Sequence, residues 1–369
     1  MAKLCLVYNF AQRYRESIFR AIDKRWDCKW YFGRNTTDIK GMDYSLLKEV
    51  HEVENETIKG PWFYQKGTSG LVFDKSISSY FLLGDPHCIS VWFIAAWVKF
   101  FCKKKNVYMW THGWYGKESR MTSFIKKRFF KLADGVFLYG NYARKLMINK
   151  GFNADKLFVI HNSLHHDKQV ELRAEMKTSG IYQKKFKNSY PTIIFIGRLT
   201  KVKKLHQLIE AIAQLKKTGK FFNVVFVGDG TERKFLEQKT QELELEENTW
   251  FYGACYDEQQ NASLIYEADL CVAPGNVGLT AMHTMVFGTP VITHSNLKNQ
   301  MPEFEAIKDG ETGSFFEEDD VTDLARSISE WFEIHGKDRD TVRKACYEEI
   351  DNYWTPEFQM QVLEQNLKV

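Results

Sequence analysis

Residues 271–294, CVAPGNVGLTAMHTMVFGTPVITH, decide the fold class of this chain. The stretch begins as an apolar strand, passes through a turn that contains Pro and Gly, and continues as an apolar helix. A second strand begins after Gly288 and Pro290. A strand, a crossover helix and another strand are the repeating unit of a parallel sheet covered by helices. The turn that opens the helix is a good cradle for an anion, although it contains no carboxylate.

The same alternation continues on both sides of this unit. Short apolar runs alternate with amphipathic stretches over most of the chain, which predicts an α/β fold with doubly wound parallel sheets. The expected strands are 3–10, 106–112, 135–140, 156–163, 191–199, 223–230, 249–253 and 269–274, and the expected helices are 15–26, 123–133, 141–151, 205–217, 232–243, 262–268 and 321–332.

A polar, charged stretch at 165–190 interrupts the alternation and is interpreted as a helix and a linker between domains. We therefore expect two Rossmann-like domains that face a central ligand cleft, with a C-terminal helix that packs back on the first domain. The expected first domain is 1–185, the expected second domain is 186–350, and the returning helix is 351–369.

The composition is typical of a globular protein with two domains, since 44% of the 369 residues are apolar and 27% are charged. The net charge of only +4 gives no signal of nucleic-acid binding. Seven scattered cysteines lack the spacing of metal ligands, so we expect no metal site and a reducing compartment. The N-terminus is interpreted as a buried strand rather than a signal peptide, which predicts a cytoplasmic protein.

One apolar stretch, ISVWFIAAWVKFF at 89–101, has two interpretations. Its thirteen residues include Lys99 and are too few to cross a bilayer, so a buried helix is the first interpretation. The second is a peripheral contact with the inner face of an anionic membrane. It rests on the basic residues at 103–105 and on SFIKKRFFKL at 123–132, where cations lie beside aromatic side chains.

Two cations follow the expected strand at 191–199. Arg198 comes directly after Gly197, and Lys203 lies five residues further on, where a helix begins. Arg offers a rigid fork to phosphate oxygens, and Lys offers a point charge. The loop at 274–280 ends a later strand of the same sheet and presents backbone N–H groups at a helix start. Two anion-binding elements at one sheet edge indicate a diphosphate.

This second half resembles the donor-binding domain of the family-4 glycosyltransferases, which have the glycosyltransferase B fold. The first half resembles that family more loosely, through its layout and THG at 111–113. The matching pieces, in order, are GRL at 197–199 with Lys203, FVGDG at 226–230, FYG at 251–253, ADLCVAP at 268–274, GLTAMHTMVFGTPVI at 278–292 and DGETGSFF at 309–316.

The resemblance implies transfer of a sugar from a nucleotide donor with retention of anomeric configuration. Arg198 and Lys203 then neutralise the diphosphate leaving group, and no metal or other cofactor is expected because these cations do its work. The expected donor contacts are Gly197 and the backbone amides of Val277, Gly278, Leu279 and Thr280.

The sequence departs from the family pattern at one motif. The family carries a Glu-x7-Glu pair whose first acid contacts the donor sugar and whose second holds the ribose. Here these positions fall on Gly275 and His283. His283 retains a ring nitrogen for a ribose hydroxyl, and Asn276 offers a neutral amide to the sugar. The loop after the next strand adds three candidates for ribose or sugar contacts, which are Gln300, Glu303 and Glu305.

Candidate residues of the first domain follow its expected strands. A His near the reacting centre is common in this family, so His112, at a strand's carboxyl end, is expected to contact the donor sugar. Trp114 and Tyr115 are expected either to stack on an acceptor sugar or to form an aromatic corner of the core. Arg13 and Arg15 are expected either to bind an acceptor phosphate or to cap the fold.

The leading prediction is a hexosyltransferase that extends a polysaccharide or lipid-linked glycan, with a nucleotide-diphosphate sugar and a saccharide or lipid-linked acceptor as its partners. One alternative is a sugar-nucleotide epimerase or hydrolase on the same fold, which the scarcity of carboxylates in these loops disfavours. The other alternative is a nucleotide-sugar-binding protein that has lost turnover. The missing acidic pair favours this second alternative, whereas the presence of Arg198 and Lys203 disfavours it.

Overall fold

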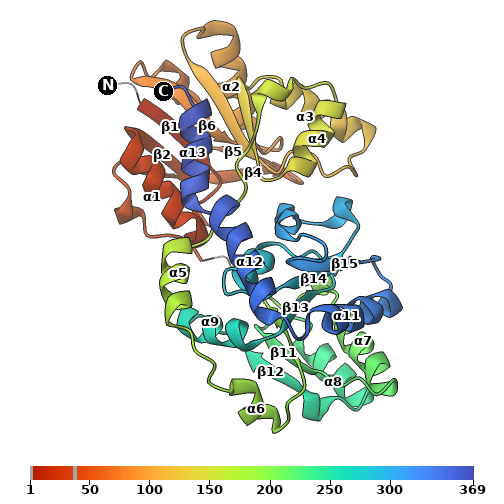
Figure 1. The fold of residues 1–369 in the computed structure, drawn as a ribbon. Coiled ribbons are helices and arrows are strands. Elements are labelled where there is room, and N and C mark those ends of the chain that lie inside the picture. The colour runs from red at the N-terminus through yellow and green to blue at the C-terminus, as the bar shows by residue number, and fades with distance from the viewer. Residues whose placement is uncertain (1–2, 36–39) are drawn as a thin grey trace. The chain divides into compact units, whose positions relative to one another are not determined.

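The computed structural model describes residues 3–35 and 40–369 (Figure 1). The chain divides into two compact units. Unit 1 extends from the N-terminus to His165 and includes Thr355–Val369, and unit 2 comprises His166–Trp354. The first boundary follows His165, at the start of the charged stretch at 165–190, whereas the predicted domains meet at 185/186. Hydrogen bonds explain this position, because backbone N–H groups of Ser179 and Ile181 donate to the carboxylate of Glu267 and so hold the stretch on unit 2.

Unit 1 is built on a seven-stranded sheet in the order β3-β2-β1-β6-β7-β8-β9, in which every neighbouring pair is parallel (Figure 1). Between β3 and β6 the chain forms a separate antiparallel hairpin of β4 and β5. The strands are β1 (Lys3–Tyr8), β2 (Cys28–Gly33), β3 (Val50–Val53), β4 (Asn55–Lys59), β5 (Trp62–Gln65), β6 (Ile77–Leu83), β7 (Asn106–Thr111), β8 (Gly135–Leu138) and β9 (Leu157–Val159).

Helices cover both faces of this sheet, because alternate residues of each strand point to opposite faces. In β1, Cys5 and Val7 pack in a core with α2, α3 and α4. Leu4 and Leu6 pack in a second core with α1 and α13. The helices of unit 1 are α1 (Glu16–Arg25), α2 (Ile89–Phe101), α3 (Arg120–Phe130), α4 (Asn141–Asn149) and α13 (Pro356–Asn366).

The C-terminal helix α13 belongs to unit 1, where it packs against α1 and β9 (Figure 1). Leu363 is fully buried in the core beneath it. The Gln359 amide donates to the carbonyl of His161 at 3.0 Å, and its side-chain oxygen accepts a hydrogen bond from Ser163 at 2.6 Å. The end of the chain therefore completes the fold of the unit that begins it.

Unit 2 carries a six-stranded parallel sheet in the order β12-β11-β10-β13-β14-β15. Its strands are β10 (Thr192–Ile196), β11 (Asn223–Val227), β12 (Thr249–Gly253), β13 (Leu270–Ala273), β14 (Val291–His294) and β15 (Gly313–Phe316). Its helices are α5 (His166–Glu175), α6 (Ile181–Phe186), α7 (His206–Lys217), α8 (Arg233–Glu242), α9 (Glu258–Glu267), α10 (Leu279–Met285), α11 (Val321–His335) and α12 (Arg339–Tyr353).

These observations confirm the predicted class of two doubly wound α/β units with parallel sheets. The quoted stretch 271–294 forms β13, α10 and β14, as expected. Among the described residues, no helix has both the length and the apolar character that a membrane span requires. Helix α2 instead buries part of its surface in unit 1, through side chains such as Val91 and Ile94.

Candidate functional site

The strand order of unit 2 creates a switch point between β10 and β13. The chain leaving β10 turns toward β11, whereas the chain leaving β13 turns toward β14 on the other side. The two loops therefore diverge at the carboxyl ends of adjacent strands, which is where open α/β sheets bind their ligands. The predicted phosphate-binding residues lie on these two loops.

The loop after β10 is fixed by close contact with the loop after β11. The N–H of Gly197 donates to Val227 at 2.9 Å, and the N–H of Leu199 donates to Asp229 at 2.9 Å. A side chain at Gly228 would place its Cβ 1.9 Å from the Gly197 carbonyl oxygen, so only glycine fits there. Between these two hydrogen bonds, Arg198 is exposed, and no residue of the described chain forms a hydrogen bond or ion pair with its side chain.

Lys203 ends the short 3-10 helix η5 (Lys201–Lys203) and reaches across to the second loop. Its Nζ donates to the carbonyl oxygen of Asn276 at 2.7 Å and to Asn276 Oδ1 at 2.9 Å. Burial lowers the pKa of Lys203 to about 8; the neighbouring Arg198 also lowers it, and Glu303 partly opposes them. The lysine is therefore a cation at neutral pH that is held by neutral oxygens.

Gly275 lies directly against the backbone of η5. Its N–H donates to the Lys203 carbonyl at 3.0 Å. A Cβ on residue 275 would lie 2.0 Å from the Val202 carbonyl oxygen and 2.7 Å from the Lys203 Cα. This approach of two backbones excludes any side chain, which is the physical reason that an acid cannot occupy position 275 in this structure.

The turn before α10 differs in one respect from the expected amide cradle. The N–H of Val277 donates to Gln300 Oε1 at 3.0 Å, and the Val277 side chain is fully buried. The Val277 N–H is therefore already paired in this structure, and its predicted contact with the nucleotide sugar would require Gln300 to release it. The same bond assigns Gln300 an internal role, which its 3% exposure supports.

Gly278, Leu279 and Thr280 complete the turn and open α10, which is only seven residues long. Gly278 has φ 55° and ψ −149°, a conformation that side chains other than hydrogen rarely permit. The hydroxyl of Thr280 donates to the Ile196 carbonyl at 2.9 Å. Thr280 thus ties α10 to β10 and keeps the two loops in register.

His283 lies one turn into α10, and its Nε2 is 3.0 Å from Glu258 Oε1. Glu258 is the first residue of α9 and also accepts a hydrogen bond from Gln169 at 2.9 Å. Burial raises the pKa of Glu258, but its bonds to His283 and Gln169 outweigh burial and lower the pKa to about 2. A carboxylate therefore stands beside the position where the family pattern has its second acid. Glu258 could not be predicted as a site residue, because nothing in the sequence pairs it with His283.

Glu303 lies in the 3-10 helix η8 (Pro302–Ala306) that follows β14, and it is 2% exposed. Its charge raises the pKa of Lys203, so the structure brings it near the predicted site. Glu303 therefore acts on Lys203 through its charge, and its buried side chain is not exposed at the surface of the loop.

In unit 1, the structure brings His112 and Arg15 together around Tyr139. The rings of His112 and Tyr139 are 4.6 Å apart, and Arg15 Nη2 donates to the Tyr139 hydroxyl. Burial, Arg15 and Lys126 lower the pKa of His112 to about 4, so the imidazole is neutral at pH 7. Tyr115 is half-buried, and its ring is 5.9 Å from that of His112.

Two other predicted residues of unit 1 do not join this group. Trp114 is 1% exposed and packs against Phe130 and Phe152, which agrees with the second alternative, an aromatic corner of the core, rather than with stacking on an acceptor sugar. The apolar contacts of its indole explain the difference, because they bury the faces that a sugar would need. Arg13 is exposed, and its side chain stays a candidate for acceptor binding.

Comparison with known proteins agrees with the geometry of unit 2. The family described as "Glycosyl transferases group 1" matches residues 178–348. The matched residues make up most of unit 2, so this unit is similar to that family. The match contains both loops of the switch point and the pair of His283 and Glu258.

Three relatives extend the likeness beyond this domain. A Klebsiella pneumoniae protein described as "Uncharacterized 41.2 kDa protein in cps region" is 26% identical over 237 residues, which are 63% of this chain and 56% of that protein. The solved structure of Anabaena HepE in complex with UDP has a TM-score of 0.73 at 17% identity and covers 99% of both chains. The lipopolysaccharide outer core galactosyltransferase WaaB has a TM-score of 0.71 at 15% identity and covers 99% of this chain and 100% of that chain.

The solved structures show that the chain has the glycosyltransferase B fold. The chain spans about half or less of the length of the curated relatives that it matches, from 56% of the Klebsiella protein to 26% of a Mycobacterium tuberculosis phosphatidylinositol dimannoside mannosyltransferase.

Proposed function

We propose that the protein is a retaining glycosyltransferase that moves a hexose from a nucleotide-diphosphate donor to a saccharide or lipid-linked acceptor. The observation that carries this proposal is the pair of cations at the switch point of unit 2. The Arg198 side chain is exposed and without a partner in the described chain, and Lys203 is held in place by Asn276.

Transfer of a sugar from a nucleotide leaves negative charge on the diphosphate. A cation that is already in place stabilises that charge most strongly in the transition state, because no reorganisation is needed when the bond breaks. Lys203 meets this requirement, since its Nζ is fixed by two oxygens of Asn276. Arg198 adds a fork of N–H donors that suits phosphate oxygens. With these two cations the reaction requires no metal.

The relatives support this choice of substrates. Solved structures of HepE contain UDP and UDP-glucose, and WaaB is described as a lipopolysaccharide outer core galactosyltransferase. The Klebsiella relative is encoded in a cps region. We therefore place this protein in the synthesis of a cell-surface polysaccharide or glycan, with a nucleotide-diphosphate hexose as the donor.

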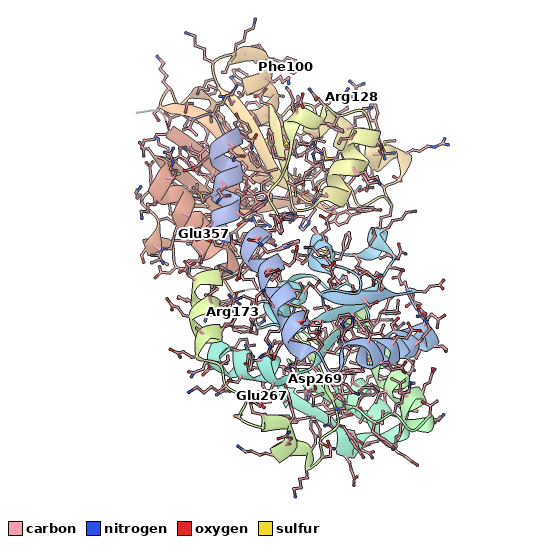
Figure 2. All side chains as sticks on the ribbon, in the orientation of Figure 1. Phe100, Arg128, Arg173, Glu267, Asp269 and Glu357 are labelled. Atoms are coloured by element: carbon pink, nitrogen blue, oxygen red, sulfur yellow. The ribbon has the colours of Figure 1, made fainter. Side chains whose placement is uncertain are left out.

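We also propose that unit 1 makes a peripheral contact with the inner face of an anionic membrane. Phe100 and Phe101 end α2 and are 67% and 70% exposed, while Phe124 of α3 is 56% exposed. Figure 2 shows Phe100 and Arg128 on the same region of unit 1, and Lys99 Nζ links the two helices by donating to the Lys131 carbonyl at 3.2 Å. Exposed aromatic residues beside cations suit the boundary of an anionic bilayer. We call Phe100, Phe101, Phe124 and Arg128 the basic-aromatic surface.

The first test is a thermal-shift titration of the full chain with UDP, GDP, dTDP, ADP and CMP, in EDTA and then in Mg²⁺. A ligand that binds only the folded state raises the melting temperature by mass action. The nucleotide that gives a shift in EDTA is then supplied as its hexose conjugates with candidate saccharide acceptors. NMR of the product shows whether the anomeric configuration is retained.

The same assay separates the two alternatives. An epimerase or hydrolase converts the nucleotide sugar without an acceptor, whereas a transferase needs one. A protein that has lost turnover binds the nucleotide and yields no product. The absence of a shift with all five nucleotides and of turnover with all their sugar conjugates would contradict the proposal.

A further inference from the structure

Unit 1 buries a group of hydrogen-bonding side-chain nitrogens that lack partners. We call Arg15, Trp110, His112 and Tyr139 the Arg15 cluster. Arg15 is 6% exposed and Trp110 is 1% exposed. Within residues 3–35 and 40–369, no partner is found for Arg15 Nε, Arg15 Nη1, Trp110 Nε1 or His112 Nδ1. Buried polar atoms are nearly always paired in folded proteins, so several unpaired atoms in one place require a reason.

The contacts within the Arg15 cluster put these atoms at one end of the sheet of unit 1. The Arg15 guanidinium lies 4.9 Å from the centre of the Trp110 ring and 5.2 Å from that of Tyr139. The Tyr139 ring is in turn 4.6 Å from the ring of His112. His112 follows β7, Tyr139 follows β8, and Arg15 precedes α1. All three therefore lie at the carboxyl edge, where this class of sheet binds ligands.

The charges around the Arg15 cluster favour an anion. In the described part of the chain, no carboxylate forms an ion pair with the Arg15 guanidinium, which donates to the neutral hydroxyl of Tyr139 and interacts with the neutral hydroxyl of Tyr8. The nearby Lys126 is paired with Glu118 at 2.7 Å and still contributes positive potential at His112. A buried cation without a counter-charge is costly to the fold, and an incoming oxyanion removes that cost.

We propose that the Arg15 cluster binds one oxyanion of the acceptor, a phosphate or a carboxylate, through Arg15 Nε and Nη1 with Trp110 Nε1 beside them. The assignment of the oxyanion to the acceptor rests on the proposed function. The fork of a guanidinium fits two oxygens of one phosphate or carboxylate group. An acceptor with such a group would be held next to His112, at the end of β7.

The test uses the full chain, saturated with the nucleotide that the thermal-shift titration identifies, so that the cations of unit 2 are occupied. Inorganic phosphate and glucuronate are then titrated separately against the unmodified protein, Arg15→Gln and Arg20→Gln. Arg20 is a matched control because it is an exposed arginine of α1 whose ion pair with Glu16 is at the surface. The two anions distinguish a phosphate from a sugar carboxylate as the preferred group.

We expect at least one anion to raise the melting temperature of the unmodified protein and of Arg20→Gln. In Arg15→Gln we expect that shift to disappear while the shift caused by the nucleotide is kept. Without ligand, Arg15→Gln should melt at the same temperature as the unmodified protein or higher, because it removes an uncompensated buried charge.

Four results would overturn the inference. The first is that neither anion raises the melting temperature of the unmodified protein, and the second is that an anion raises it equally in Arg15→Gln. The third is that the nucleotide no longer raises the melting temperature of Arg15→Gln. The fourth is that unliganded Arg15→Gln melts well below unliganded Arg20→Gln. The third would assign Arg15 to the donor, and the fourth would make it a structural residue. The anion shift is read without turnover, so it fails or succeeds separately from the proposed transferase activity.

Discussion

Lys203 Nζ donates hydrogen bonds to both oxygens of Asn276, at 2.7 Å from the carbonyl and 2.9 Å from Oδ1. These bonds join the loops after β10 and β13, which diverge at the switch point of unit 2. Because both acceptors are neutral, the lysine is positioned without the loss of its charge to an ion pair. A buried amine of this kind loses its proton at a lower pH than an exposed one.

The first prediction concerns the pH dependence of nucleotide binding. The pKa of Lys203 is lowered to about 8, so the amine is charged below that pH and neutral above it. We expect the affinity for a nucleoside diphosphate to fall above pH 8, by up to about tenfold for each pH unit, since the charged fraction falls in that proportion. Titration calorimetry from pH 6.5 to 9.5 measures this. Lys203→Gln should bind more weakly at pH 7 and show a flat profile, and an equally steep fall in that variant would contradict the assignment.

The second prediction concerns Arg198. Arg198→Gln should lower the rate of transfer by about 10²–10³-fold, the usual cost of removing one group that stabilises transition-state charge. It should leave the melting temperature unchanged, because the side chain is exposed and has no partner in the described chain. Lys201→Gln is the matched control, an exposed cation of the same loop that should keep its activity. Turnover in Arg198→Gln equal to that of the control would remove Arg198 from the reaction.

The third prediction concerns Gly275. A Cβ at this position meets the Val202 carbonyl oxygen at 2.0 Å, and a backbone atom cannot move away cheaply. Gly275→Ala should therefore lower the free energy of unfolding by about 1–3 kcal/mol, as overpacking usually does. It should also weaken nucleotide binding, because it displaces Lys203. Gly70→Ala is the control, since a Cβ there meets no atom within 4 Å. Urea denaturation of the two variants measures the difference, and equal stability would show that the loops adapt.

Much of the fold could be predicted because strands buried on both faces leave continuous apolar runs in the sequence. Strand β6 was missed although it lies in the centre of its sheet. Its sequence, ISSYFLL, contains two polar serines, which interrupt the apolar run that is typical of a buried strand. Ser79 is nonetheless fully buried, and its hydroxyl donates to the carbonyl of Lys368, 289 residues away. The partner that makes a serine acceptable in this strand is invisible to any local pattern.

In the candidate site too, residues fixed by a local pattern could be predicted, and contacts between distant segments could not. Gly197, Arg198 and Lys203 could be predicted because a strand end and a nearby helix start fix their positions along one short loop. The use of the Val277 amide by Gln300 could not be predicted, because their contact depends on how the loop after β14 folds back. Trp114 could not be placed for a similar reason, since its burial depends on Phe130 and Phe152 from other elements.

The fourth prediction concerns the pair of His283 and Glu258. If the pair holds the ribose, His283→Ala should weaken nucleotide binding more than it slows transfer, and Glu258→Gln should weaken binding in the same direction. The expected loss is about tenfold in each variant, the usual value of one hydrogen bond to a charged group. The double variant should lose less than the sum of the two single losses, since the residues contact each other at 3.0 Å. An unchanged dissociation constant in both single variants would contradict the ribose assignment.

The fifth prediction concerns the basic-aromatic surface of unit 1. Phe100→Ser with Phe101→Ser should reduce co-sedimentation with vesicles that contain anionic lipid, because the rings are 67% and 70% exposed and stand beside cations. Arg128→Gln should reduce it further, and added salt should weaken binding of the unmodified protein. Phe235→Ser is the matched control, because Phe235 is a 47% exposed aromatic residue of unit 2 and does not belong to this surface. Little of the unmodified protein or of the control should co-sediment with vesicles of neutral lipid. If the double Phe variant sediments like the control, the exposed aromatic residues serve another purpose and the membrane contact is refuted.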